Sequence, residues 1–159
     1  MNKVALFRHV LVPHDFSDAA DAALRTAADL AASGDGRLTV LNVVAPTYLI
    51  SDPMFTASLP PPEAAVPDVR ASLEQRVARV LGARKVPAKV VVKVGHPAET
   101  VVDLASSASL IVMSTHGRTG VSHLLMGSVA ERVVRLSTTP VLTIRPKTRG
   151  AKAGSGRKR

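Results

Sequence analysis

Residues 110–131 read LIVMSTHGRTGVSHLLMGSVAE. The first four are continuously apolar, which is typical of a strand buried on both faces of a parallel sheet. Three of the chain's ten glycines follow before residue 128. Ser128 and Glu131 then form the pattern of a capping box, which predicts that a helix begins at Ser128. A buried strand, a glycine-rich loop and a helix thus follow one another, as they do in α/β proteins.

The same alternation extends along the rest of the chain. Short apolar runs predict strands at 9–16, 37–44, 88–94, 109–114 and 140–145. Capping residues, helical spacing of apolar residues and glycine stops predict helices at 17–33, 68–81, within 95–108 and at 128–137. This order predicts one α/β domain, an open, doubly wound, five-stranded parallel sheet with helices on both faces, which is a Rossmann-like fold.

The segment 46–67 interrupts this alternation. It holds six of the chain's eleven prolines. Proline has a fixed φ and no backbone N–H, so we expect no regular helix and no inner strand here. We interpret the segment as a surface excursion.

Composition excludes several classes of protein. The chain has no cysteine, which excludes disulfides and thiolate metal sites. Its five histidines form no H-x-x-x-H pair, so we expect no metal site built by protein ligands alone. No apolar stretch reaches the ~18–20 residues of a membrane span. The apolar N-terminal stretch is interrupted by Arg8, His9 and Pro13, so we interpret it as a first strand rather than a signal peptide, and the protein as cytoplasmic.

The positive charge is concentrated at the C-terminus. The chain has a net charge of +9, and residues 146–159 contain six Lys or Arg and no acid, which leaves +3 for the rest. Because this tail lacks apolar groups to bury, residues 147–159 are predicted to be disordered. The tail either keeps the protein soluble or contacts nucleic acid nonspecifically. No membrane partner is expected.

The glycine-rich stretch has the character of an anion site. Gly117, Gly120 and Gly127 are able to adopt positive φ and to let backbone N–H groups approach a ligand. A helix that begins at Ser128 adds free N–H groups and the positive end of its dipole, which favour phosphate, and Arg118 adds a cation. The alternative is that the glycines only make turns and Ser128 only caps its helix.

Over residues 6–146 the chain resembles the universal stress protein family. The resemblance is carried by VLVPHDFSDAADAAL (10–24) and by VMSTHGRTGVSHLLMGSVAERVVRLSTTPVLTIRP (112–146). ATP-binding members of that family carry G-x-x-G, nine residues and then G-[ST]. Residues 114–117, 118–126 and 127–128 match this spacing, with Ser114 in place of the first glycine.

The resemblance implies that residues 1–146 form a nucleotide-binding domain with strand order 3-2-1-4-5. It implies ATP as the ligand, with any Mg²⁺ held mainly by the phosphates. The implied triphosphate contacts are Gly117, Gly127, Ser128 and Val129; the implied adenosine contacts are Pro13, Asp15, Val43 and Met113. His116 is expected to line the same site. For Asp15 the alternative is a carboxylate that caps a helix. Ser114 either donates its hydroxyl to a phosphate or, if positive φ is required there, costs ~1–2 kcal/mol.

Two classes of function remain. The first is an ATP-binding regulatory module of the stress response with an unidentified protein partner. The second is a slow ATPase or phosphoryl-transfer enzyme at the same site, but the sequence offers no convincing pair of catalytic residues. The strand at 140–145 is expected at the edge of the sheet, where it predicts a homodimer, as the resemblance also implies. The alternative is an edge protected by its shortness, by its flanking prolines and by the charged tail.

Overall fold

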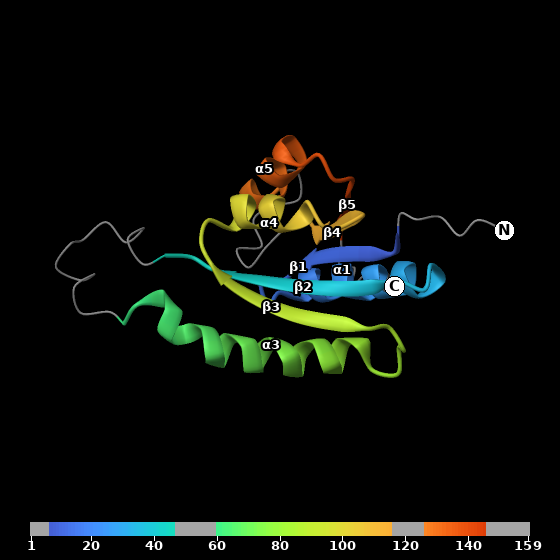
Figure 1. Ribbon diagram of the computed structural model, residues 1–159, viewed down its shortest axis with the longest axis horizontal. Helices are drawn as coiled ribbons and strands as arrows, with labels where there is room; N and C mark the ends of the chain where they lie inside the picture. The colour runs from blue at the N-terminus through green and yellow to red at the C-terminus, as the bar shows by residue number, and fades with distance from the viewer. Residues whose placement is uncertain (1–6, 47–59, 116–125, 146–159) are drawn as a thin grey trace, which may run out of the picture.

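A computed structural model describes residues 7–46, 60–115 and 126–145. Five parallel strands form one sheet in the order β3-β2-β1-β4-β5, as predicted (Figure 1). The strands are β1 (His9–Pro13), β2 (Arg37–Val44), β3 (Ala88–Val94), β4 (Leu110–Ser114) and β5 (Val141–Ile144). The helices are α1 (Asp18–Ser33), α3 (Val66–Leu81), α4 (Pro97–Ala105) and α5 (Ser128–Leu136), with a short 3₁₀ helix η3 (Pro62–Ala65).

The helices cover both faces of the sheet. Helices α1 and α3 pack on one face over a core that includes Val12, Leu24 and Leu73. Helices α4 and α5 pack on the other face over a second core that includes Ile111 and Val133, and they lie opposite α3 in Figure 1. The winding therefore changes direction between β1 and β4. In open α/β sheets, ligands bind where the carboxyl ends of two such strands diverge.

Local capping explains most of the helix bounds. The Ser17 hydroxyl accepts a hydrogen bond from the N–H of Ala20 at 3.1 Å, so Ser17 caps the start of α1. Helix α3 ends at Leu81 and is followed by the C-cap Gly82, whose φ of +53° suits glycine. It begins at Val66, inside the segment expected to lack a helix. That expectation was wrong for Val66 and Pro67, because proline is tolerated in a first turn, where its missing N–H has no intrahelical partner.

Some of the predicted segments lie outside the described residues, and two further findings concern the residues that are described. Most of the proline-rich excursion and all of the basic tail from residue 146 lie outside the described residues. Within the three described ranges, no helix is long and apolar enough to cross a membrane. The same ranges contain no group of three or more His, Cys, Asp or Glu placed to hold a metal ion.

Candidate functional site

A cavity of about 300 Å³ lies where β1, β2 and β4 end and where α5 begins. The sequence-predicted residues that line it are Pro13, Asp15, Val43, Met113, Ser114, Gly127, Ser128 and Val129. The structure thus brings together residues from four elements at the edge where the winding reverses. The other predicted site residues, His116, Gly117, Arg118 and Gly120, lie outside the described residues.

Part of the cavity lining is apolar. Leu41 and Val43 of β2, Met113 of β4, and Pro97 and Val101 of α4 contribute to it. Sequence reasoning missed Leu41, Pro97 and Val101. They carry no signal of their own, because an apolar residue that faces a cavity has the same pattern as one that faces the core. The polar lining residues His14, Asn42 and Thr115 were missed as well.

The first turn of α5 forms another part of the cavity wall. Gly127 is the N-cap, with φ −62° and ψ 146°, and among the described residues no side chain caps this helix. The predicted capping box is therefore wrong, since Ser128 is already the first helical residue and its hydroxyl is not used as a cap. The expectation that Gly127 would use positive φ is also wrong. No described residue accepts a hydrogen bond from the N–H of Ser128, Val129 or Ala130, which are first-turn donors of the kind that bind anions.

Ser114 lies in extended backbone at the end of β4. Among the described residues, the only ones other than glycine with positive φ are Phe16 and Asp35. Ser114, which occupies the position of the first motif glycine, therefore does not have positive φ. The energetic cost that positive φ would have imposed on a serine does not apply.

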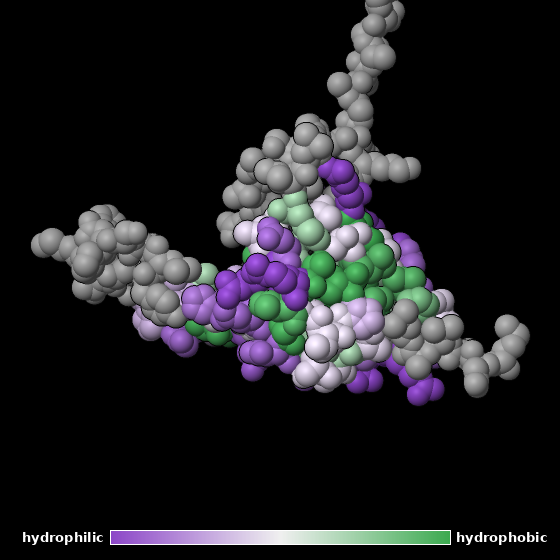
Figure 2. Space-filling view, turned by 90° about the horizontal axis from the view of Figure 1, so that it is seen from above, coloured by the Kyte–Doolittle hydropathy of each residue, from purple (hydrophilic) through white to green (hydrophobic). Residues whose placement is uncertain are grey.

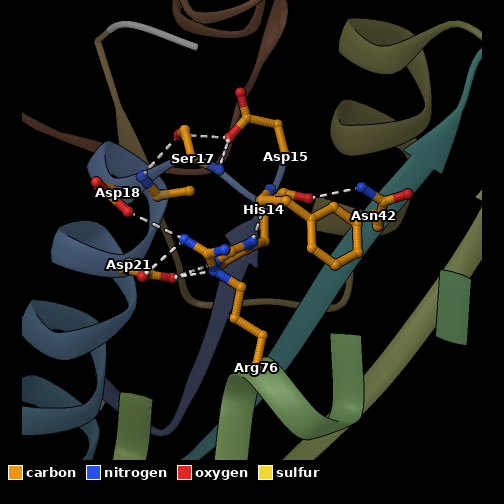
Figure 3. Close-up of polar contacts among 9 residues, drawn as sticks. His14, Asp15, Ser17, Asp18, Asp21, Asn42 and Arg76 are labelled. Carbon is orange, nitrogen blue, oxygen red and sulfur yellow. Dashed lines mark hydrogen bonds and ion pairs between the residues drawn. The ribbon is translucent and has the colours of Figure 1, made fainter. Parts of the chain in front are cut away.

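Asp15 follows β1 and is part of the turn that leads into α1. Its Oδ1 accepts hydrogen bonds from the N–H of Ser17 at 3.1 Å and from the Ser17 hydroxyl at 2.6 Å. The carboxylate thus orients the residue that caps α1 instead of capping the helix directly. Its second oxygen accepts no hydrogen bond from a described residue, and in Figure 3 it points away from the neighbouring side chains.

His14 lies beneath this turn and is only 3% exposed. Its Nε2 lies 3.0 Å from Oδ1 of Asp21, and its Nδ1 accepts a hydrogen bond from the N–H of Phe16 at 3.1 Å. Arg76 reaches over from α3 and donates to both carboxylate oxygens of Asp21 at 2.8 and 2.9 Å (Figure 3). Three elements therefore meet in one hydrogen-bonded cluster below the cavity.

Burial and charge shift the acid–base properties of this cluster. Burial lowers the pKa of His14 below its ordinary value of 6.5, although the hydrogen bond to Asp21 opposes the shift. Burial alone would raise the pKa of Asp21, but the hydrogen bonds and charge of Arg76 outweigh it, with a smaller contribution from His14. The pKa of Asp21 therefore lies below its ordinary value of 3.8. At neutral pH, His14 is uncharged and Asp21 is ionised.

The family model of the universal stress protein family matches residues 6–145. The chain belongs to this family. The match covers all five strands and the whole cavity, so the universal stress protein fold includes every element described above.

Individual universal stress proteins agree with this assignment. YxiE of Bacillus subtilis is 29% identical over 149 residues, which span 88% of this chain and 100% of that protein. The solved structure of MJ0577 from Methanocaldococcus jannaschii superposes with a TM-score of 0.74 at 25% identity, covering 91% of this chain and 99% of that one. A universal stress protein solved in complex with cAMP shares the fold, with a TM-score of 0.61 at 24% identity and coverage of 87% and 96%.

Proposed function

We propose that this universal stress protein is an ATP-binding regulatory module of the stress response. The observation that carries the proposal is the pairing, in one cavity, of an apolar wall with the uncapped first turn of α5. These two parts of the cavity match the two ends of a nucleotide in polarity. An adenine ring is flat and largely apolar on its faces, whereas a triphosphate is anionic.

The apolar wall suits the base. In our proposal the adenine lies against Val43 and Met113, and Val101 of α4 also lines the cavity. Asp15 accepts a hydrogen bond from the adenosine through the carboxylate oxygen that is not engaged by Ser17. A cavity of about 300 Å³ is at the lower end of the range for small-molecule sites.

The first turn of α5 suits the phosphates. The N–H groups of Ser128 and Val129 point out of the start of the helix, where the helix dipole favours an anion. The glycine-rich segment between β4 and α5 completes this end of the proposed site through Gly117 and Arg118. Mg²⁺, if it binds, is held mainly by the phosphates.

A binding role accounts for the described lining better than an enzymatic one. Phosphoryl transfer requires a positioned activator of the nucleophile together with strong neutralisation of charge. The ionisable side chains among the described lining residues are those of Asp15 and His14. His14 is turned away into the Asp21 cluster, so the two do not form a catalytic pair.

Native mass spectrometry of the purified protein tests the proposal first, because it reports a bound nucleotide and the oligomeric state together. Calorimetry with MgATP should then give a Kd in the micromolar range, about −8 kcal/mol. AMP and cAMP serve as comparison ligands, since a relative of the same fold was solved with cAMP. No heat and no thermal shift at millimolar MgATP would refute ATP binding, whereas tighter binding of cAMP would reassign the ligand.

We also propose that two copies pair through β5. The large apolar side chains that are exposed among the described residues all belong to α5 or β5: Val129, Val134, Leu136 and Leu142, at 36–46% exposure. Figure 2 looks onto the side on which α4 and α5 lie, and a continuous apolar area crosses the middle of this face. Apolar side chains next to an open strand edge are typical of an interface with a second copy.

A further inference from the structure

The turn between β1 and α1 contains an unfavourable backbone conformation close to the proposed ligand. Phe16 has a φ of +67°, in the left-handed region that residues other than glycine rarely adopt. It follows Asp15, whose carboxylate lines the cavity. Such a conformation persists only where surrounding contacts impose it, so the contacts of Phe16 help to determine where Asp15 is held, together with the two hydrogen bonds from Ser17 to its carboxylate.

The side chain of His14 supplies one of these contacts. The N–H of Phe16 donates to Nδ1 of His14 at 3.1 Å. A ring nitrogen that accepts a hydrogen bond carries no proton, so the proton of the neutral ring is on Nε2. Nε2 then donates to Oδ1 of Asp21 at 3.0 Å. The geometry therefore selects one tautomer, and Asp21 is the group that fixes it.

The backbone of His14 is held independently of its ring. Its N–H donates to the carbonyl oxygen of Leu41, and its carbonyl oxygen accepts from the side chain of Asn42, both at 2.8 Å. These two bonds attach His14 to β2. Loss of the contact between the ring and Phe16 would thus release the turn that follows His14 and leave the end of β1 in place.

Arg76 extends the cluster to α3. Its guanidinium holds both oxygens of Asp21 and also donates to Asp18 at 3.2 Å. A two-pronged arginine–carboxylate contact is geometrically specific, and here it fixes the carboxylate that orients His14. In Figure 3 the chain of contacts runs from Arg76 through Asp21 and His14 to the turn that carries Asp15.

We propose that Arg76, Asp21 and His14 are positioning residues that hold the β1–α1 turn, and with it Asp15, in the conformation that binds the nucleotide. The proposal rests on the ATP-binding function inferred above and adds a regulation to it. In this arrangement α3 controls nucleotide affinity from outside the cavity, because Arg76 anchors the cluster without lining the site.

Acid provides a second control. Protonation of His14 places a proton on Nδ1, which then faces the N–H of Phe16, so two donors oppose each other. The charged groups around the ring are Asp21 of α1, Arg76 of α3 and the neighbouring Asp15, and β2 contributes the neutral Asn42. Burial keeps the pKa of His14 below 6.5, so nucleotide affinity should be constant at neutral pH and fall only at more acidic pH.

Hydrogen exchange of the Phe16 amide tests the positioning without any ligand. The variants are His14→Ala, which removes the acceptor, and His14→Asn, whose side-chain oxygen accepts from the N–H two residues ahead in an Asx turn. Exchange should accelerate in His14→Ala and stay close to that of the parent in His14→Asn. Imidazole ¹⁵N shifts should show the Nε2–H tautomer. Equal protection of Phe16 in all three proteins, or the Nδ1–H tautomer, would overturn the proposal.

Affinity for MgATP tests the consequence for the site. Arg76→Gln should weaken binding about tenfold, the effect of one or two lost hydrogen bonds. Arg84→Gln is the matched control, because Arg84 makes a similar contact with α1, to Asp29 at 2.8 Å. It should change affinity less than about twofold. Each affinity is measured at a temperature at which circular dichroism shows the variant to be folded.

The pH profile separates positioning from general stability. At pH values below the pKa of His14, the affinity of the parent for MgATP should decrease. The affinity of His14→Asn should show no such decrease. Titration of the nucleotide is common to both proteins and cancels in their ratio. If the parent binds MgATP and Arg76→Gln binds it equally well, the positioning role is wrong while the proposed function stands. If the parent binds no nucleotide, the proposed function is wrong, and Phe16 exchange alone decides whether the cluster holds the turn.

Discussion

The backbone N–H of Gly127 donates to the carbonyl oxygen of Thr115 at 2.7 Å. This bond joins the end of β4 to the start of α5, so the two ends of the glycine-rich segment between them are fixed to each other. It also occupies the Gly127 donor. The N–H groups left for a ligand are therefore those of the next three residues, in the first turn of α5.

Gly127→Val tests whether a ligand approaches this turn closely. The φ of −62° and ψ of 146° are accessible to any residue, so valine should not strain the backbone and the fold should be kept. Its side chain would occupy the space beside the first-turn donors. We expect affinity for MgATP to fall at least about 100-fold, ~2.7 kcal/mol, in calorimetry. Unchanged affinity in a folded variant would place the nucleotide elsewhere.

Ser128→Ala should have a smaller effect. It removes a hydroxyl that does not cap the helix and leaves the backbone donors in place. The expected loss is about 1 kcal/mol, the net contribution of one hydrogen bond. Calorimetry under the same conditions measures it. A loss as large as that of Gly127→Val would show that the side chain, and not the backbone, is the main phosphate contact.

Hydrolysis of ATP should be slow. Asp15 is engaged by Ser17 through one oxygen, and His14 is directed toward Asp21, so neither is arranged to activate a water with the other. Turnover should remain below ~1 s⁻¹, the low end of ordinary enzymes. A phosphate-release assay measures it. Faster release that is lost in Asp15→Asn would favour the enzymatic alternative.

The buried histidine predicts a loss of stability in mild acid. The pKa of His14 is lower in the folded state than its ordinary value of 6.5, so between these two values the unfolded chain binds a proton that the folded protein does not. The free energy of unfolding should therefore decrease as the pH falls through this window. Below the window, His14 should cause no further decrease. Urea titrations of the parent and of His14→Asn measure the difference. If the free energies of unfolding of the two proteins depend on pH in the same way, His14 makes no such contribution.

The sequence was sufficient for the succession of strands and helices because those signals are local, whereas the order of the strands in the sheet was implied by the family resemblance. The strands at 37–44 and 88–94 have the predicted bounds. The capping box at Ser128 failed for a tertiary reason. The helix begins at Ser128, as predicted, but its N-cap is Gly127, whose N–H is bonded to the carbonyl oxygen of Thr115, so the capping position lies one residue before the one that the pattern indicates.

The positioning cluster was beyond prediction from one sequence. Arg76 and Asp21 are 55 residues apart in the chain, and each resembles an ordinary charged residue on a helix surface. Their contact depends on how α1 and α3 pack side by side on the same face of the sheet. His14 was visible only as part of the Pro-His-Asp end of the first strand, and nothing in the sequence indicates which way its ring turns.

The open edge of β5 has a defined hydrogen-bonding pattern. The carbonyl oxygen of Pro140 accepts a hydrogen bond from the N–H of Ile111 in β4, and that of Ile144 accepts one from the N–H of Thr115, the residue after β4. In a strand, the N–H and C=O of one residue point to the same side, and this side alternates from one residue to the next. The backbone groups of Val141 and Thr143 therefore point away from β4. These are the groups that a second copy would pair with.

Thr143→Pro should therefore separate the proposed dimer without disturbing the sheet. Proline removes the N–H of Thr143, which points to the open edge, and its ring obstructs a partner strand. The bonds from Ile111 to Pro140 and from Thr115 to Ile144 are unaffected. Thr143→Val is the matched control, because it keeps the N–H and nearly the same volume. Light scattering at tens of micromolar protein should show a dimer for the parent and for Thr143→Val, and a monomer for Thr143→Pro that still binds MgATP. A monomeric parent would refute the pairing, and a dimeric Thr143→Pro would move the interface from the edge of β5 to the apolar side chains of α5.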